Sequence, residues 1–411
     1  MGSSVYFSLA KLSLFVFPEW FVVILPDYDF SFKCAIFQPS NTIQMKRTGF
    51  QIKSLLLLTI VLLIAFQGQA QHRLVLLHPT VSNIENMEWM VENKIIDIPD
   101  VEMVGVYYAE EEYDYTSSVK YLAEHPLKNY QLLKIEGALK PEDIYRENSC
   151  TAAFRKLFEE SDAIIFFGGP DIPAAIYGEE QNLLTVVTDP HRHYFETSLF
   201  FHLIGGSRNA DFKPLLADKP DFIIRAFCLG MQTMNVAAGG TLVQDIPLEI
   251  YHLNTLEKVS AQPVEKQHRS YSTPLFPLED LWGGNFHPIR ISKTGYLRAI
   301  AGLAGATTPN VLSYHHQAVG KMGANLKVIA SSIDGKVIEG LQHVKFKNVV
   351  GVQFHPEPSV LYNSETKLTT VPESPFSPNE RLSKSNSLSF HKLFWKDFSE
   401  KVKQNKNIDK N

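Results

Sequence analysis

Short, continuous apolar runs that alternate with segments of helical spacing are the feature that most restricts how this chain can fold. The apolar runs lie at residues 73–79, 101–108, 130–137, 161–169 and 221–227. The helical patterns lie at residues 82–94, 150–161, 192–205 and 230–239. The runs at 161–169 and 221–227 show no polar alternation, so they predict strands that are covered on both faces, whereas the run at 130–137 is a possible strand only. Their alternation with helices predicts an α/β fold with a doubly wound, mostly parallel sheet.

The later part of the chain predicts a small antiparallel β addition. β-rich runs lie at residues 310–319, 326–344 and 348–358. Asp334-Gly335, inside the second run, is typical of a hairpin turn. We therefore expect the main domain to span residues 71–358. Residues 359–411 should form a loop rich in Ser, Thr, Pro and Asn, followed by a C-terminal helix.

The first 70 residues predict export rather than part of that domain. From Met45 a basic start precedes an apolar run at about residues 55–66, and small residues follow. This layout is typical of a signal peptide over residues 45–70, and the apolar run is shorter than the roughly 20 residues of a spanning helix. A membrane anchor or a core helix is the alternative. We expect residues 1–44 to be a mis-assigned N-terminal extension, and the protein to be secreted or periplasmic, with no stable membrane anchor after cleavage.

Charge and cysteine content exclude two classes of protein. The formal net charge is −5, whereas nucleic-acid-binding domains are typically basic, so we expect no nucleic-acid partner. Three cysteines in 411 residues are too few for a disulfide scaffold. We predict that Cys150 and Cys228 are both free.

Cys228 is a candidate nucleophile because of its place in the pattern. It lies between the apolar run at 221–227 and the helical segment at 230–239. A residue at such a strand-to-helix turn is exposed at the top of a sheet. The helix N-terminus beside it favours the reactive thiolate. A buried structural cysteine is the alternative.

The segment "GVQFHPEP" supplies a candidate base for that nucleophile. His355 and Glu357 each precede a proline, which disfavours helical backbone at both positions. In an extended segment, residues two apart point to the same side. Glu357 can therefore orient the imidazole of His355, which gives a Cys-His-Glu triad. A proline-stiffened surface loop is the alternative.

Two further segments predict polar groups near the nucleophile. After the strand at 161–169, Gly169 can aim its N–H at a developing oxyanion, with the N–H of Leu229 as second donor. An ordinary strand-end turn is the alternative. His315 and His316 are adjacent, so in a strand they face opposite sides. We therefore favour groups of a substrate pocket over a metal site.

Four segments now stand in order: "FFGGPDIP", "FCLGMQTMNVAAGGTL", "YHHQAV" and "GVQFHPE". Together they resemble the class I glutamine amidotransferase-like superfamily, and within it most closely the gamma-glutamyl-gamma-aminobutyrate hydrolase family of C26-type peptidases. The resemblance covers roughly residues 73–357. It implies a flavodoxin-like sheet with helices on both faces. It also implies roles for individual residues: Cys228 as nucleophile, His355 as base, Glu357 as its orienting partner, and Gln232, His316 and Gln317 in the substrate pocket.

The function implied by the resemblance is hydrolysis of gamma-glutamyl amide bonds through a gamma-glutamyl thioester. The expected partner is a small-molecule gamma-glutamyl substrate, with no metal or organic cofactor, and a homodimer is one option for the assembly. The alternatives are a non-catalytic binding protein, a metal-dependent hydrolase and a glutamine amidotransferase subunit. The acidic stretch at 109–115, the segment at 244–300 and the tail depart from the family pattern, which leaves the leaving amine open.

Overall fold

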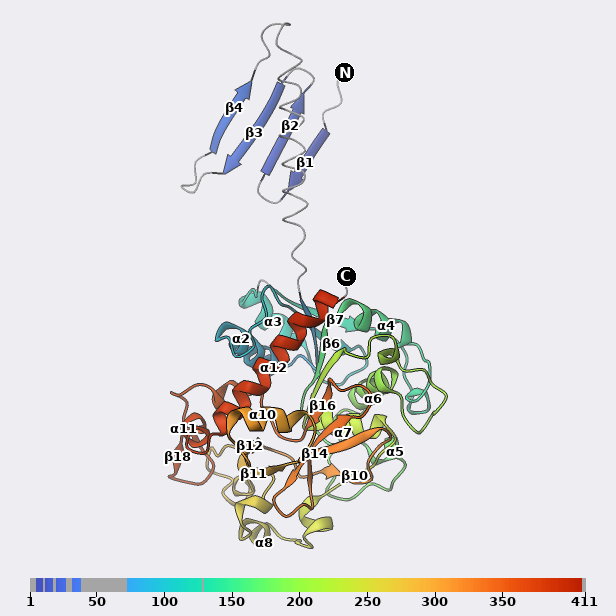
Figure 1. Ribbon diagram of the computed structural model, residues 1–411, viewed down its shortest axis with the longest axis vertical. Coiled ribbons are helices and arrows are strands. Elements are labelled where there is room, and N and C mark those ends of the chain that lie inside the picture. Colours follow the sequence, from blue (N-terminus) through green and yellow to red (C-terminus); the bar gives the residue numbers. More distant parts are fainter. Residues whose placement is uncertain are drawn as a thin grey trace. The chain divides into compact units, whose positions relative to one another are not determined.

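The structure is a computed structural model in which the chain divides into two compact units, Met1–Ala70 and Gln71–Asn411 (Figure 1). It describes residues 72–127 and 129–408, together with four strands near the start of the chain. Those strands form an antiparallel sheet in chain order: β1 (Val5–Leu9), β2 (Leu12–Phe17), β3 (Trp20–Pro26) and β4 (Phe32–Phe37). That residues 1–44 precede the true start of translation stays a prediction.

The predicted export signal is not supported. Residues 45–70 lie outside the described residues, and the part of the chain that is described shows no signal peptide. The description of the protein as secreted or periplasmic is therefore corrected: it depended on that signal alone. Among the described helices, none has both the length and the apolar character needed to cross a membrane.

The larger unit is built on one ten-stranded sheet. Six neighbouring strands run parallel, in the order β7 (Tyr130–Ile135), β6 (Glu102–Tyr108), β5 (Arg73–Leu77), β8 (Ala163–Phe166), β9 (Ile223–Phe227) and β16 (Val349–Val352). Four antiparallel strands continue the sheet, in the order β15 (Ile338–His343), β14 (Leu326–Ser332), β11 (Asn285–Ile291) and β12 (Asn310–Ser313). Without the outer strand β7, the parallel strands follow the flavodoxin-like order 2-1-3-4-5.

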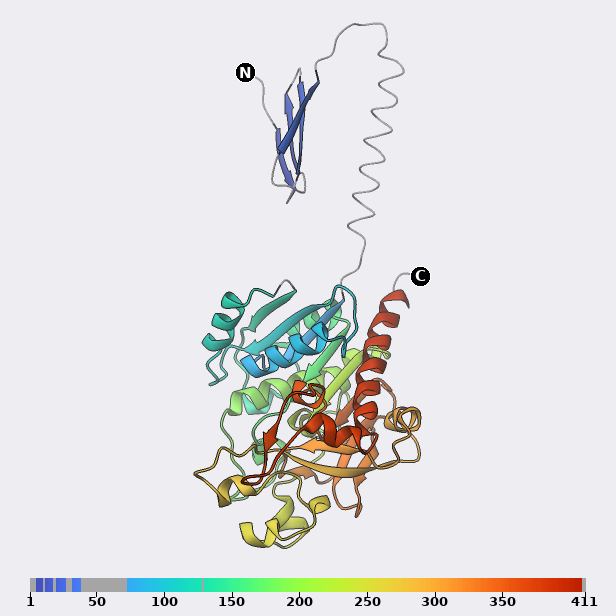
Figure 2. The ribbon, with the colours of Figure 1, turned by 90° about the vertical axis from the view of Figure 1, so that its left-hand side faces the viewer.

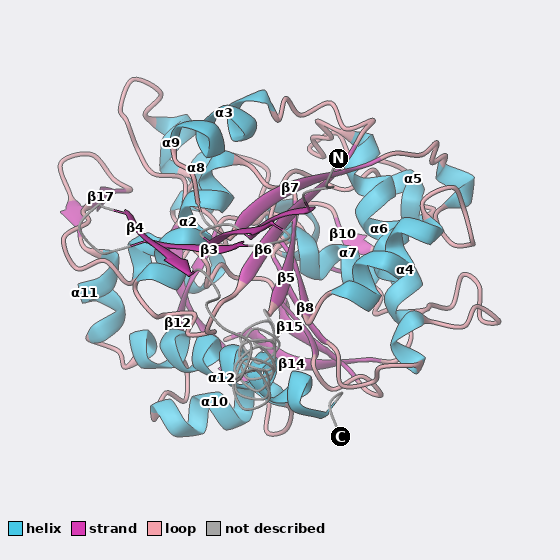
Figure 3. Ribbon diagram, turned by 90° about the horizontal axis from the view of Figure 1, so that it is seen from above, coloured by secondary structure: helices cyan, strands magenta, loops and turns pink. Residues whose placement is uncertain are grey.

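Helices cover both faces of this sheet (Figure 3). One core contains side chains of α2 (Val81–Glu92), α10 (Tyr296–Ala304) and α12 (Ser387–Ile408). The other contains side chains of α4 (Thr151–Glu160), α6 (Pro190–Ile204) and α7 (Leu229–Ala237). Alternate residues of one strand enter opposite cores: Leu74 and Leu76 join the first, Val75 and Leu77 the second. The predicted doubly wound α/β fold with continuous apolar strands is confirmed.

The antiparallel part differs in detail from the prediction. The strands on either side of Asp334-Gly335 form the expected hairpin, β14 with β15. The run at 348–358 was expected to be antiparallel, but β16 pairs antiparallel with β15 and parallel with β9. The addition therefore extends the main sheet instead of forming a separate one. A two-stranded sheet pairs β10 (Leu242–Val243) with β13 (Ala318–Val319), and another pairs β17 (Leu368–Thr369) with β18 (Pro375–Phe376).

Short helices and one long one complete the unit. The short ones are α3 (Thr116–Glu124), α5 (Ala174–Tyr177), α8 (Leu256–Ser260), α9 (Ser272–Leu275) and α11 (Pro378–Ser383). The long helix α12 lies along one flank of the unit, in red in Figure 2. Its residues Phe390, Phe394, Trp395, Phe398 and Val402 are fully buried. This part of the tail is therefore built into the core.

Candidate active site

Cys228 lies at the junction of β9 and α7, in a strained backbone conformation. Its φ is 50° and its ψ is −106°, a region that residues other than glycine rarely occupy. Such strain is typical of a nucleophile held at the top of a sheet. The N–H of Cys228 donates to the carbonyl of Val352 at 2.9 Å, so β16 holds the turn. A Cβ atom on Gly230 would lie 2.5 Å from the carbonyl oxygen of Phe166, so only glycine fits the next turn of backbone.

His355 and Glu357 form a buried pair beside this cysteine. Nδ1 of His355 donates to Oε1 of Glu357 at 2.6 Å. Burial by itself lowers the pKa of His355, but the charges of Glu357 and Cys228 raise the pKa to about 10. Nε2 of His355 makes no well-aligned hydrogen bond to a described residue, but the interaction of the ring with Cys228 helps to raise its pKa, so this nitrogen is placed to exchange a proton at the thiol. The arrangement suits a thiolate–imidazolium pair oriented by a carboxylate.

Neighbouring segments fix the backbone of that pair. The N–H of His355 donates to the carbonyl of Leu312 at 2.9 Å. The next carbonyl, that of Pro356, accepts from the hydroxyl of Tyr362 at 2.6 Å and from Nε1 of Trp395 at 2.9 Å. Helix α12 therefore holds the candidate base in place, which the sequence did not indicate.

Of the two glycines after β8, Gly168 lies against the candidate base and nucleophile, whereas Gly169 lies against Arg192 and Leu229. A Cβ on Gly168 would lie 2.6 Å from Cε1 of His355 and 3.5 Å from Cβ of Cys228. The carbonyl of Gly168 accepts from Nη2 of buried Arg192 at 3.0 Å. Arg192 is itself paired with Glu196 at 2.7 Å. Arg192, held by this ion pair, therefore fixes the backbone of the glycine turn. The sequence did not predict this contact, because the pattern of α6 does not show which segment the helix packs against.

The residues predicted for a substrate pocket lie on adjoining segments. Gln232 is buried and its side chain donates to the carbonyl of Gln317 at 3.3 Å. His316 lies between two carboxylates, 3.1 Å from an oxygen of Asp171 and 3.1 Å from one of Asp245. Burial acts to lower the pKa of His316, but its hydrogen bonds to both aspartates raise it. The side chain of Gln317, 1% exposed, has no hydrogen-bond partner among the described residues.

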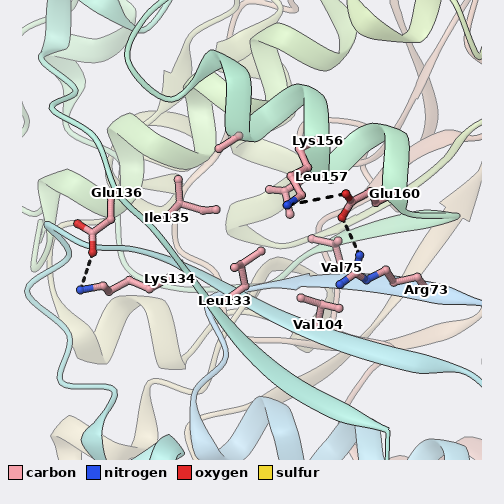
Figure 4. A pocket seen from close by; sticks show the side chains of 11 residues that line it. Arg73, Val75, Val104, Leu133, Lys134, Ile135, Glu136, Lys156, Leu157 and Glu160 are labelled. Atoms are coloured by element: carbon pink, nitrogen blue, oxygen red, sulfur yellow. Dashed lines mark hydrogen bonds and ion pairs between the residues drawn. The ribbon is translucent and has the colours of Figure 1, made fainter. Parts of the chain in front are cut away.

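A cavity of about 330 Å³ opens beside the candidate base. Its lining comes from five segments of the chain and consists of Ser82, Asn83, Asn86, Gly168, Trp282, Tyr314, His355, Glu357, Pro358 and Val360. Another cavity, of about 260 Å³, lies between α4 and the strands β5 to β7 (Figure 4). Its polar lining is engaged in ion pairs, Arg73 and Lys156 with Glu160, and Lys134 with Glu136. That second cavity includes none of the candidate catalytic groups.

Both cysteines of the larger unit are free, as predicted. Cys150 is fully buried, and burial raises the pKa of its thiol. Cys228 is 6% exposed and is therefore buried as well, not exposed at the top of the sheet as expected. What distinguishes the two thiols is the strained backbone of Cys228 and its place beside His355.

Comparison with known proteins gives consistent matches. "Putative glutamine amidotransferase-like protein YvdE" of Lactococcus lactis is 30% identical, over 48% of this chain and 66% of that protein. "Protein NtpR" of Enterococcus hirae is 32% identical, over 48% of this chain and 68% of that protein. The chain thus spans about two thirds of the length of these relatives. The solved structure of a putative GMP synthase protein from Thermoplasma acidophilum is 11% identical, over 74% of this chain and 97% of that one, with a TM-score of 0.34, too weak a likeness to support any argument.

The family model named peptidase C26 matches residues 146–357. This span contains Cys228, His355 and Glu357 together with the glycine turn after β8. It begins well after the segments predicted for export. The chain belongs to the peptidase C26 family, within the class I glutamine amidotransferase-like proteins.

Proposed function

We propose that this protein is a cysteine-dependent hydrolase that cleaves gamma-glutamyl amide bonds. The observation that carries the proposal is the strained Cys228 at the end of β9, with the His355–Glu357 pair beside it. Membership of the peptidase C26 family supports hydrolysis of an amide. The specificity for gamma-glutamyl amides is a further part of the proposal. It rests on the sequence resemblance to the gamma-glutamyl-gamma-aminobutyrate hydrolase family and on the charged groups around His316.

In the proposed reaction, the Cys228 thiolate attacks the side-chain amide carbonyl of the substrate. The N–H groups of Gly169 and Leu229 would stabilise the oxyanion that forms. His355 then gives the proton on Nε2 to the departing amine as the C–N bond breaks, which leaves a thioester on Cys228. Water, deprotonated by His355, then attacks the thioester; the C–S bond breaks, glutamate leaves, and the Cys228 thiolate and the protonated His355 are restored.

The charged groups around His316 support recognition of an amino-acid end group. Both ring nitrogens of His316 lie 3.1 Å from a carboxylate oxygen, of Asp245 and of Asp171, and because an ionised carboxylate only accepts, the ring carries a proton on each nitrogen and a positive charge. The positive charges of His316 and of nearby Arg269 offset those of the two aspartates, so the support for an α-ammonium group of a gamma-glutamyl substrate comes from the carboxylate oxygens as hydrogen-bond acceptors. In this proposal, Gln232 and Gln317 supply the neighbouring amides that hydrogen-bond the substrate.

The test is turnover of a chromogenic gamma-glutamyl anilide and a panel of gamma-glutamyl amides by the full chain. Cys228→Ala should abolish turnover, whereas Cys150→Ala, the matched change at a buried thiol, should retain it. Iodoacetamide should label Cys228 in preference to Cys150. No turnover of any member of the panel, with a readily labelled Cys228, would reject gamma-glutamyl specificity. An unlabelled Cys228 would reject the nucleophile itself.

A glutamine amidotransferase subunit is the second candidate, favoured by the names of the bacterial relatives. Such a protein would use the same three residues to release ammonia from free glutamine. Ammonia production from glutamine that exceeds hydrolysis of every other gamma-glutamyl amide, and that rises when a partner enzyme is supplied, would favour this candidate over the hydrolase.

A further inference from the structure

A second group of chemically active side chains lies away from the proposed triad. It consists of His268, His287, His315 and Glu339, whose nearest donor atoms all lie within 4.8 Å of one another. Each of these residues is at least 96% buried, with exposures of 2%, 0%, 4% and 0% in that order. Burial of four polar side chains in one place is costly unless their polar atoms are satisfied.

These atoms are only partly satisfied by the protein: Nδ1 of His268 lies 3.0 Å from Oε1 of Glu339 without the alignment of a hydrogen bond. Both ring nitrogens of His268, Nε2 of His287, Nε2 of His315 and both carboxylate oxygens of Glu339 lack hydrogen bonds to the described residues. Among the described residues, the ion-pair partners within reach of Glu339 are the three histidines, which are neutral unless protonated. A cation at the centre of the group would supply both the missing contacts and the missing charge.

The rings are already turned toward such a centre. Oε1 of Glu339 lies 3.0 Å from Nδ1 of His268, 3.8 Å from Nε2 of His287 and 3.7 Å from Nε2 of His315. Nδ1 of His315 donates to the carbonyl of Gln317 at 2.8 Å, and Nδ1 of His287 lies 3.3 Å from the carbonyl of Pro288. Because these bonds place the proton on Nδ1, the Nε2 lone pair of each ring points at the group.

The spacing suits a tetrahedral ion. Bonds of about 2.0–2.1 Å to a tetrahedral zinc place neighbouring ligand atoms roughly 3.4 Å apart. The distances from Oε1 of Glu339, 3.0, 3.8 and 3.7 Å, lie on either side of that value, and all four ligand atoms lie within 4.8 Å of one another. Three imidazoles and one carboxylate are ligands that zinc accepts, and four protein ligands leave no open position for substrate. We propose that His268, His287, His315 and Glu339 bind a structural Zn²⁺.

Such an ion would join parts of the chain that lie far apart in sequence. His268 lies in the segment 244–300, His287 is on β11, Glu339 is on β15, and His315 precedes the predicted substrate residues His316 and Gln317. The proposed ion therefore holds this departure from the family pattern against the substrate segment. The adjacent histidines His315 and His316 do not bind one ion together, because His316 faces Asp171 and Asp245. The other proposed ligands, which lie beside His315, come from other segments of the chain.

The test is the metal content of the full chain, measured by mass spectrometry of first-row metals after purification without added metal. We expect about one zinc per chain in the wild type. Glu339→Gln and His287→Gln should lose most of it, whereas His125→Gln, the same change at an exposed histidine, should retain it. Protein made in metal-depleted medium should gain roughly 5 °C or more in Tm on addition of Zn²⁺, and little on addition of Mg²⁺.

The wild-type measurement decides the matter even if the variants do not fold. A metal content below about 0.1 ion per chain, with no rise in Tm when zinc is added, would overturn the proposed site. The four side chains would then form a cluster that binds no metal. A stoichiometric metal other than zinc would overturn the zinc assignment. Both readouts are independent of hydrolysis, so a failure of the proposed function would leave this result unchanged.

Discussion

Replacing Gly168 with alanine should displace the imidazole of His355 while leaving every proposed catalytic side chain in the protein. The new Cβ would lie 2.6 Å from Cε1 of His355, where ordinary contact begins at about 3.4 Å, so the ring must move by the difference, about 0.8 Å. His355 has little room, because Glu357 and the carbonyl of Leu312 hold its ring and backbone. A misplacement of about 1 Å near reacting groups costs on the order of 10²-fold in rate.

The assay compares Gly168→Ala with Gly302→Ala, a change at a glycine with no atom within 4 Å of its new Cβ. We expect kcat/KM on the gamma-glutamyl anilide to fall roughly 100-fold in the first variant and less than about twofold in the second. The rate of Cys228 alkylation, which does not depend on the substrate, should fall as well. If Gly168→Ala keeps both rates within about threefold of the wild type while folding normally, the reasoning about the base is refuted.

Three further predictions concern the same part of the molecule. Glu357→Gln removes the carboxylate that raises the pKa of His355, so alkylation of Cys228 at pH 7 should slow at least about tenfold, and an unchanged pH–rate profile would contradict this. Because the pKa of His355 is raised on folding, its contribution to the free energy of unfolding is complete below about pH 6.5 and is lost as pH rises through about 10. Urea unfolding between pH 6 and 10 should show that decline, and Glu357→Gln should flatten it. Trp395→Phe loses the hydrogen bond to the carbonyl of Pro356, which should lower the free energy of unfolding by about 1 kcal/mol; urea unfolding measures this loss, with half-buried Trp89→Phe as the control.

Features that depend on local sequence could be predicted. Apolar runs located β5, β6, β8 and β9, because a strand covered on both faces needs a continuous apolar segment. The candidate triad could be predicted for the same reason. Cys228 lies between a strand and a helix, and a proline follows each of His355 and Glu357, so each signal depends on only a few neighbouring residues.

Features that depend on tertiary contacts could not be predicted. The run that forms β16 is apolar enough for either kind of pairing, so nothing in it shows that β9 is a parallel neighbour. Arg192 donates a hydrogen bond to the carbonyl of Gly168, although the two residues are 24 positions apart in the sequence. The ligands of the proposed zinc site come from two strands and two loops with no regular spacing, and only the folded chain brings them together.

The hydrogen bonds to the carbonyl of Pro356 have a consequence for the order in which the protein matures. When synthesis has passed Glu357, every proposed catalytic group already exists. The Trp395 donor, however, belongs to α12, which is made about 30 to 50 residues later, a few seconds at ordinary rates of translation. The segment that carries His355 is therefore fully fixed only after α12 has docked. A nascent chain would remain catalytically silent until its last long helix has folded onto the sheet.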